Sequence, residues 1–122
     1  MPRQILDDSR LHPAIRQQVE NLHSDIVHNV QAAALSNPVL VVGMAGNPFV
    51  SRARAALTKA GVAHHYRGYG SSFGQWRERN ALKMWSGWPT FPLVFVKNHL
   101  IGGASDLTRL IDSGELKRLL GE

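Results

Sequence analysis

Apolar positions recur every three or four residues through the first part of the chain, between residues 12 and 35. This spacing is typical of amphipathic helices and predicts one or two of them. Pro13 suits a first helical turn, and Ser24 and Asp25 either cap a second helix or lie within a single one. The predicted apolar face consists of Ile15, Val19, Leu22, Ile26, Val30 and Ala33.

A continuous aliphatic run at residues 39–42 predicts a strand that is buried on both faces. A helix is expected directly after it, because Asn47 is a favoured N-cap residue and Pro48 is favoured at the first helical position. Gly61 then ends this helix. Its predicted apolar face consists of Val50, Ala53, Leu57 and Ala60.

The remaining pattern alternates between strands and helices, and the strand at 62–69 is expected to run parallel to the first. The order predicts an α/β fold class, a four-stranded mixed sheet with helices on both faces. Residues 1–36 are predicted to form an N-terminal helical extension, and 37–122 the main domain. The other predicted elements are a helix at 73–85 with apolar members Phe73, Trp76, Ala81, Leu82 and Trp85, strands at 93–96 and 99–101, a helix at 107–111 capped by Ser105 and Asp106, and a turn or short helix at 115–120.

Composition narrows the possible chemistry. A chain of 122 residues is long enough for one domain with a core. It contains no cysteine, which excludes thiol nucleophiles, disulfides, and zinc or iron–sulfur sites with thiolate ligands. Lys and Arg (14) exceed Asp and Glu (9) by five, which favours small anions or nucleic acid as partners unless the basic surface is merely solvated. With no apolar run of membrane-spanning length and no signal-peptide pattern, we expect a cytoplasmic protein without a membrane partner.

Three separated stretches resemble the glutaredoxins, which have the thioredoxin fold. They are NPFVSRARAALTKAGV, ALKMWSGWPTFPLVFVKNHLIGGASDL and LIDSGELKRLL, and the match runs in order from about residue 37 to residue 120. The resemblance therefore implies a thioredoxin-like fold of glutaredoxin type, with 37–122 as a glutaredoxin-like domain.

The chain departs from this family at the start of the helix that follows the first strand. Glutaredoxins carry Cys-Pro-Tyr-Cys or Cys-Gly-Phe-Ser there, and Asn47 and Val50 stand at the two cysteine positions of the dithiol form. A helix N-terminus lowers the pKa of a thiol. Without the thiol, an Asn oxygen can satisfy the same N–H donors and contribute about 1 kcal/mol. Because thiol–disulfide exchange needs a thiolate, we expect a redox-inactive protein with no catalytic residue.

The peptide-binding half of the family pattern is better preserved. In glutaredoxins the residue before a cis-proline pairs its backbone with the cysteinyl part of glutathione, and Phe91 and Pro92 match these places. The start of the last helix, where Ser105 replaces an acidic residue, would hold the γ-glutamyl end. Arg79 matches a basic position at the glycine carboxylate, although an arginine on a helix surface can also be merely solvated. The predicted groove residues are Asn47, Phe49, Arg79, Thr90, Phe91, Pro92, Gly103, Ala104 and Ser105.

Two other constellations carry less weight. His64 and His65 would point to opposite faces of a strand, and His23 and His28 diverge on a helix, which disfavours a metal site. Tryptophans interleaved with basic residues can stack on nucleic-acid bases, but packing in the core or at its rim is the better explanation here. We therefore expect no metal and no nucleic-acid partner.

The leading hypothesis is a non-catalytic protein that binds glutathione or an extended peptide in the groove. It requires no cofactor, and glutathione enters as a ligand. The main alternative is a scaffold whose N-terminal helices hold a protein partner while the groove is vestigial. A transferase that uses glutathione as cosubstrate, without a protein cysteine, also stays open.

Overall fold

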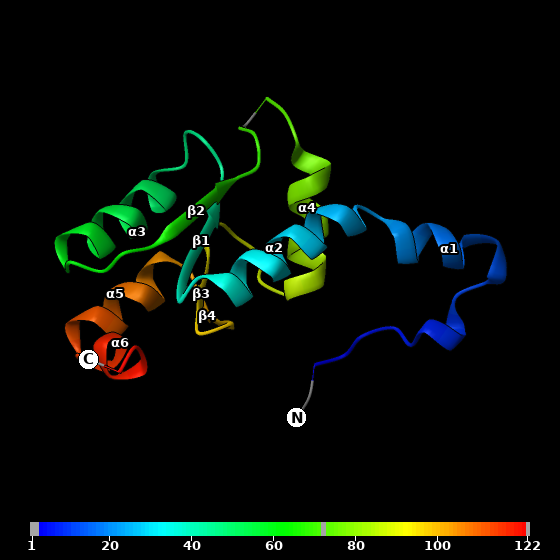
Figure 1. Ribbon diagram of the computed structural model, residues 1–122. Coiled ribbons are helices and arrows are strands. Elements are labelled where there is room, and N and C mark those ends of the chain that lie inside the picture. Colours follow the sequence, from blue (N-terminus) through cyan, green and yellow to red (C-terminus); the bar gives the residue numbers. More distant parts are fainter. Residues whose placement is uncertain (1–2, 72, 122) are drawn as a thin grey trace.

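Helices cover both faces of a mixed sheet in the computed structural model, which describes residues 3–71 and 73–121 (Figure 1). The four strands lie in the order β2-β1-β3-β4. β1 is parallel to β2 and antiparallel to β3, and β3 is antiparallel to β4. This arrangement confirms the predicted fold class. The strands are β1 (Val39–Gly43), β2 (His65–Gly68), β3 (Leu93–Val96) and β4 (His99–Gly102).

The described segment before the sheet contains three separate helices. A short 3-10 helix, η1 (Asp8–Arg10), precedes α1 (Pro13–Asn21) and α2 (Ser24–Ser36). His12 caps α1 by accepting a hydrogen bond from the N–H of Ala14 at 3.0 Å. His23 has a left-handed backbone with φ 47°, which interrupts the helical conformation between α1 and α2. α1 and α2 are therefore separate helices, and Figure 1 shows α1 extending away from the sheet.

α2 belongs to the core, whereas α1 does not. Val30, Ala33 and Ala34 of α2 are buried in one cluster with residues of the sheet. None of the described residues of α1 is buried. The boundary between 1–36 and 37–122 stays a prediction, but the packing of α2 crosses it. The buried members of this cluster are Val30, Ala33, Ala34, Leu40, Val42, Val50, Tyr69, Leu82, Phe91, Leu93 and Phe95.

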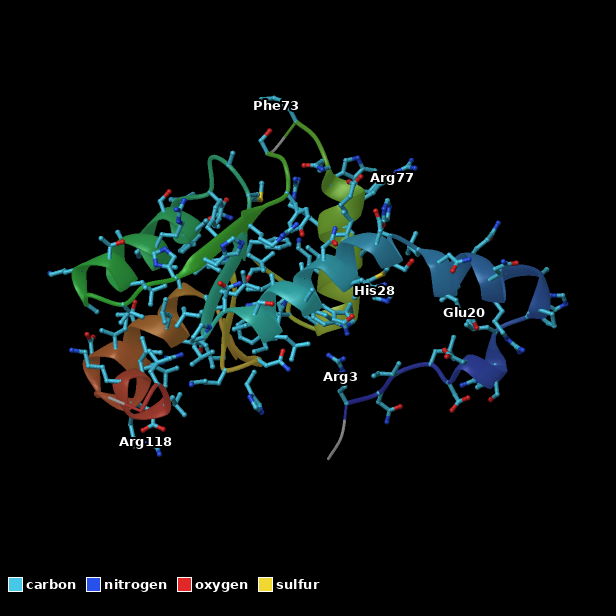
Figure 2. All side chains as sticks on the ribbon, viewed as in Figure 1. Arg3, Glu20, His28, Phe73, Arg77 and Arg118 are labelled. Atoms are coloured by element: carbon cyan, nitrogen blue, oxygen red, sulfur yellow. The ribbon has the colours of Figure 1, made fainter. Side chains whose placement is uncertain are left out.

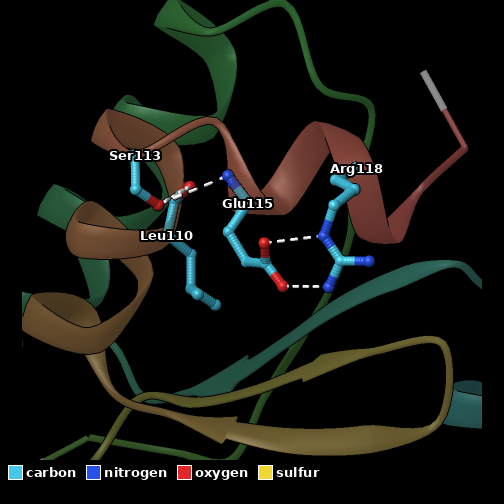
Figure 3. A network of polar contacts seen from close by, with 4 residues as sticks. All are labelled: Leu110, Ser113, Glu115 and Arg118. Atoms are coloured by element: carbon cyan, nitrogen blue, oxygen red, sulfur yellow. Dashed lines mark hydrogen bonds and ion pairs between the residues drawn. The ribbon is translucent and has the colours of Figure 1, made fainter.

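The opposite face of the sheet is covered by α3 (Pro48–Lys59), α5 (Ala104–Asp112) and α6 (Glu115–Leu119). The turn from α5 into α6 is held by Ser113, whose Oγ donates to the carbonyl of Leu110 at 3.2 Å and accepts from the N–H of Glu115 at 3.3 Å (Figure 3). The carboxylate of Glu115 also pairs with Arg118. The buried members of this second cluster are Val39, Val41, Ala53, Leu57, Val62, Val94, Val96, Ala104, Leu107 and Leu116.

The prediction for the helix at 73–85 was wrong at its start. α4 (Trp76–Ser86) begins at Trp76, because Gln75 before it has a left-handed backbone with φ 57° that a continuing helix does not allow. Phe73 therefore lies in the loop between β2 and α4, and its side chain is 100% exposed instead of packed on a helix face.

Two further boundaries differ from the predicted ones. The strand expected at 62–69 is confined to His65–Gly68, because the N–H of Val62 bonds to the carbonyl of Leu57 and so completes the end of α3. α5 begins at Ala104 and not at residue 107, since Gly103 is its N-cap. Over the described part of the chain, no helix combines the length and apolarity that a membrane crossing needs.

Candidate functional site

The N-terminus of α3 is closed by its own N-cap side chain. The Oδ1 atom of Asn47 accepts hydrogen bonds from the N–H of Phe49 at 2.8 Å and of Val50 at 3.2 Å. Val50 is buried beside Gly43, where a Cβ atom would come within 2.7 Å of Val50 Cγ1. Phe49 is 50% exposed at this helix end. Asn47 thus satisfies the donors that would stabilise a thiolate in a glutaredoxin with cysteine.

The chain enters β3 through a cis peptide bond between Phe91 and Pro92, as the family resemblance implied. The Phe91 ring is buried in the core, and Lys83 Nζ lies 5.6 Å from its centroid. Thr90 is exposed directly before it. The Phe91 side chain therefore anchors this segment, while its backbone follows the wall of the groove described below.

The N-terminus of α5 is organised by Asp106. The Oδ2 atom of Asp106 accepts from the N–H of Gly103 at 2.9 Å, and Oδ1 accepts from Nη2 of Arg109 at 2.7 Å. The bond from Gly103 lowers the pKa of Asp106 below its ordinary value of 3.8, partial burial opposes this lowering, and Arg109 adds to it. Ala104 and Ser105 occupy the first helical positions, where a helix offers no acceptor to the backbone N–H groups.

These three segments enclose a groove with a volume of about 260 Å³. All the predicted groove residues except Asn47 and Arg79 line it, and the structure adds Trp88 and Asp106 to them. The lining residues are Phe49, Trp88, Thr90, Phe91, Pro92, Gly103, Ala104, Ser105 and Asp106.

Arg79 does not line this groove, and it is not a solvated surface arginine. It is only 8% exposed, and its Nη1 atom donates to the carbonyls of Tyr69 at 2.9 Å and Gly74 at 2.6 Å. The loop between β2 and α4 turns its carbonyl oxygens toward α4, and a guanidinium group is the donor that satisfies two of them at once. The side chain therefore holds this loop, and its Nη1 donor is already occupied.

Sequence reasoning did not place Trp88 or Asp106 in the groove. Trp88 packs against the rim of the core, as the tryptophans were expected to do, and it also lines the groove; its Nε1 is buried without an acceptor among the residues that the structure describes. Asp106 was expected to cap a later helix. The sequence indicates these two residues only by their position next to residues that match the family pattern, in the pairs Trp88-Pro89 and Ser105-Asp106.

The carboxylate of Asp106 is expected to stabilise the fold in a pH-dependent way. Asp106→Ala removes the acceptor of the Gly103 N–H and should lower the free energy of unfolding by about 1 kcal/mol at pH 7. Because the folded pKa is depressed, this contribution is complete above the unfolded value and is lost as the pH falls below 3.8 through the folded pKa. Urea unfolding of both proteins at pH 7 and near pH 2 measures it. A difference that does not change with pH would contradict the electrostatic origin.

Between residues 3–71 and 73–121, no group of three or more His, Asp or Glu side chains is placed to hold a metal ion. The neighbouring residues His64 and His65 border a shallow hollow near Pro38 that contains no carboxylate.

Comparison with known proteins identifies clear relatives. A glutaredoxin-like protein of Dictyostelium discoideum is 43% identical over 98 residues, which cover 80% of this chain and 80% of that protein. Monothiol glutaredoxin-S11 of Oryza sativa subsp. japonica is 36% identical over 96 residues, which cover 74% of this chain but only 19% of the longer relative. No protein-family model matches the chain.

Solved structures with the same fold are also glutaredoxins. The crystal structure of a buckwheat glutaredoxin–glutathione complex aligns with a TM-score of 0.72 at 22% identity and covers 84% of this chain and 93% of that one. Oxidized glutaredoxin 2 from Chlamydomonas reinhardtii aligns with a TM-score of 0.70 at 23% identity and covers 81% and 94% of the two chains. At these identities the likeness establishes the fold.

Proposed function

This chain belongs to the glutaredoxin family, and we propose that it is a non-catalytic member that binds glutathione or an extended peptide in the groove between Phe91 and the start of α5. The proposal rests on one observation: the groove is present, and the N-cap of α3 beside it is Asn47 instead of a cysteine. Binding of this kind requires no cofactor.

The lining of the groove suits a γ-glutamyl peptide. The N–H groups of Ala104 and Ser105 lie at the N-terminus of a nine-residue helix, where a carboxylate is favoured by both the free donors and the helix dipole. Asp106 brings a carboxylate to the same end of the groove. The ammonium group of a γ-glutamyl peptide would therefore have an anion nearby, although Ser105 replaces the acidic residue of the family pattern. The glutathione complex of the structurally similar buckwheat protein supports this choice of ligand.

The absence of cysteine supports the non-catalytic part of the proposal. Thiol–disulfide exchange begins with attack by a thiolate, and the sequence has none to offer. A bound glutathione would supply the only thiol in the complex. The protein would then hold, present or sense the peptide instead of exchanging disulfides with it.

Titration with reduced glutathione tests the proposal. We expect heat of binding and chemical-shift changes at Phe91 and Ser105 below about 10 mM ligand, the concentration that corresponds to about 3 kcal/mol of binding free energy. Ser105→Trp should abolish both signals, because an indole ring at this exposed position fills the groove. Thr58→Trp, near the far end of α3, is the matched control and should bind as the natural chain does. If the natural chain gives no signal throughout this range, glutathione is refuted as the ligand of the groove.

A scaffold function remains a second candidate because α1 presents an apolar face to solvent. Ile15, Val19 and Leu22 are 44%, 47% and 47% exposed. Val19 and Leu22 border a hollow of about 400 Å³ that Met84 and Trp85 of α4 line from the other side. If Val19→Glu abolishes capture of a protein partner and glutathione produces no signal in the titration, this candidate replaces the first.

A further inference from the structure

Exposed aromatic rings and arginines gather at the end of the molecule that holds the α3 N-terminus. We call Phe49, Arg52, Phe73, Trp76 and Arg77 the aromatic rim. Phe73 is 100% exposed, Trp76 58% and Phe49 50%. Figure 2 shows Phe73 projecting from the loop between β2 and α4, with Arg77 on the helix that follows.

Two loops bring the parts of the rim to one end. The N–H of Ala45 donates to the carbonyl of Gly70 at 2.8 Å, and the N–H of Tyr69 donates to the carbonyl of Gly43 at 2.9 Å. These bonds tie the loop before α3 to the loop before α4, and both loops lie at the top of Figure 1. Rings from two segments that are distant in sequence therefore belong to the same end of the fold.

Each arginine of the rim lies over an aromatic ring. The guanidinium carbon of Arg52 is 5.2 Å from the centroid of Phe49, and that of Arg77 is 5.3 Å from the centroid of Trp76. Both arginines are exposed. Stacking on a ring orients a guanidinium group and leaves its N–H edge available to a carboxylate.

The stretch of sequence that carries the rim is basic. Residues 26–77 contain no Asp or Glu, and the nearest acidic residue in the sequence is Glu78, on α4. An excess of cationic side chains attracts anions. The carboxylates next to the rim residues are those of Glu78, beside Arg77, and Asp106, which lines the groove with Phe49. The cationic side chains of this stretch are Arg52, Arg54, Lys59, Arg67 and Arg77.

We propose that the aromatic rim docks an acidic segment of a partner protein, with carboxylates on Arg52 and Arg77 and apolar side chains over Phe73 and Trp76. Exposed aromatic residues next to arginines are the residue types that dominate the energetics of protein interfaces. Phe49 lines the groove as well as the rim, so one extended chain can contact both. The choice of a polypeptide over a nucleic acid rests on the proposed function of that groove.

Titration of the full chain with designed peptides tests this inference. The probe is a peptide of alternating Glu, Asp, Leu and Phe, and its counterpart carries Gln and Asn in place of the acids. We expect the acidic peptide to bind about fivefold more tightly at low salt, a ratio that corresponds to about 1 kcal/mol shared by two exposed ion pairs. Its affinity should fall as the salt concentration rises.

Charge reversal locates the contact. The double variant Arg52→Glu/Arg77→Glu should weaken the acidic peptide by about fivefold or more, and Phe73→Ser should weaken both peptides. Lys117→Glu, an exposed change on α6, is the control with the same sign of charge change and should have no effect. All these positions are exposed, so melting temperatures close to that of the natural chain verify folding.

Three results would overturn the inference: equal affinity for both peptides, equal loss in the control and the double variant, or tighter binding of a single-stranded oligothymidylate than of the acidic peptide. Glutathione distinguishes this inference from the proposed function. If the peptide binds at the rim but glutathione does not bind, only glutathione as the groove ligand is refuted. If glutathione binds equally to the natural chain and the double variant but the peptide does not bind, only the proposal for the rim is refuted.

Discussion

Replacement of Asn47 by cysteine is expected to create a reactive thiol in a protein whose natural sequence has none. The N–H groups of Phe49 and Val50 now point at the Asn47 oxygen, and they would point at the new sulfur in its place. Donors and the helix dipole at such a position lower the pKa of a cysteine thiol from about 8.5 to between about 3.5 and 7.5. A pKa of about 6.5 raises the thiolate fraction at pH 7 about 25-fold, from about 3% to about 76%.

Alkylation rates as a function of pH measure this thiol, and the turnover of a mixed glutathione disulfide measures its use. The natural chain should show no turnover, and Asn47→Cys should show it. Ala55→Cys, exposed near the middle of α3, is the matched control and should keep a pKa near 8.5. Indistinguishable pKa values in the two variants would mean that the α3 terminus does not act on residue 47 as described. Loss of the cap should also lower the free energy of unfolding by about 1 kcal/mol.

The parts of the site that sequence analysis predicted are those set by neighbouring residues. Asn47 followed by Pro48 is a local signal for a helix start, and the structure contains the corresponding hydrogen bonds. The strand at 39–42 was visible because a fully buried strand is continuously apolar. The prediction that the Phe91–Pro92 and Gly103–Ser105 segments line one groove came from the family resemblance, because no periodicity in the sequence relates them.

The parts that sequence analysis missed depend on backbone groups distant in the chain. Arg79 has the sequence context of an exposed helical arginine, and only the fold shows that two loop carbonyls face it. Phe73 fits the apolar pattern of the helix that follows it. The left-handed backbone of Gln75 keeps Phe73 out of that helix, and the sequence does not reveal this conformation because glutamine rarely adopts it. Asp106 was predicted to cap a helix at 107–111, but it lies within the first turn of α5, whose N-cap is its bonding partner Gly103.

Arg79→Met is expected to be among the most destabilising single changes in this fold. Methionine keeps an unbranched apolar side chain but lacks the guanidinium group, so the carbonyls of Tyr69 and Gly74 lose their charged donor. Hydrogen bonds that involve a charged group contribute about 1.5–3 kcal/mol each, and loss of this shared pair should reduce the free energy of unfolding by about 3 kcal/mol. Amide exchange in the loop between β2 and α4 should accelerate in parallel.

Urea denaturation and amide exchange measure these effects, and Arg77→Met on the same helix is the control. Arg77 is exposed, so its replacement should change the free energy of unfolding by no more than about 0.5 kcal/mol. Glutathione binding distinguishes two roles of Arg79: holding the loop between β2 and α4, or binding the glycine carboxylate of glutathione. If the residue only holds the loop, Arg79→Met binds glutathione as the natural chain does once the folded fraction is taken into account. A loss of glutathione affinity at unchanged stability would instead place its guanidinium on the glycine carboxylate, as in the family pattern, and would require the side chain to leave Tyr69 and Gly74 when the ligand binds.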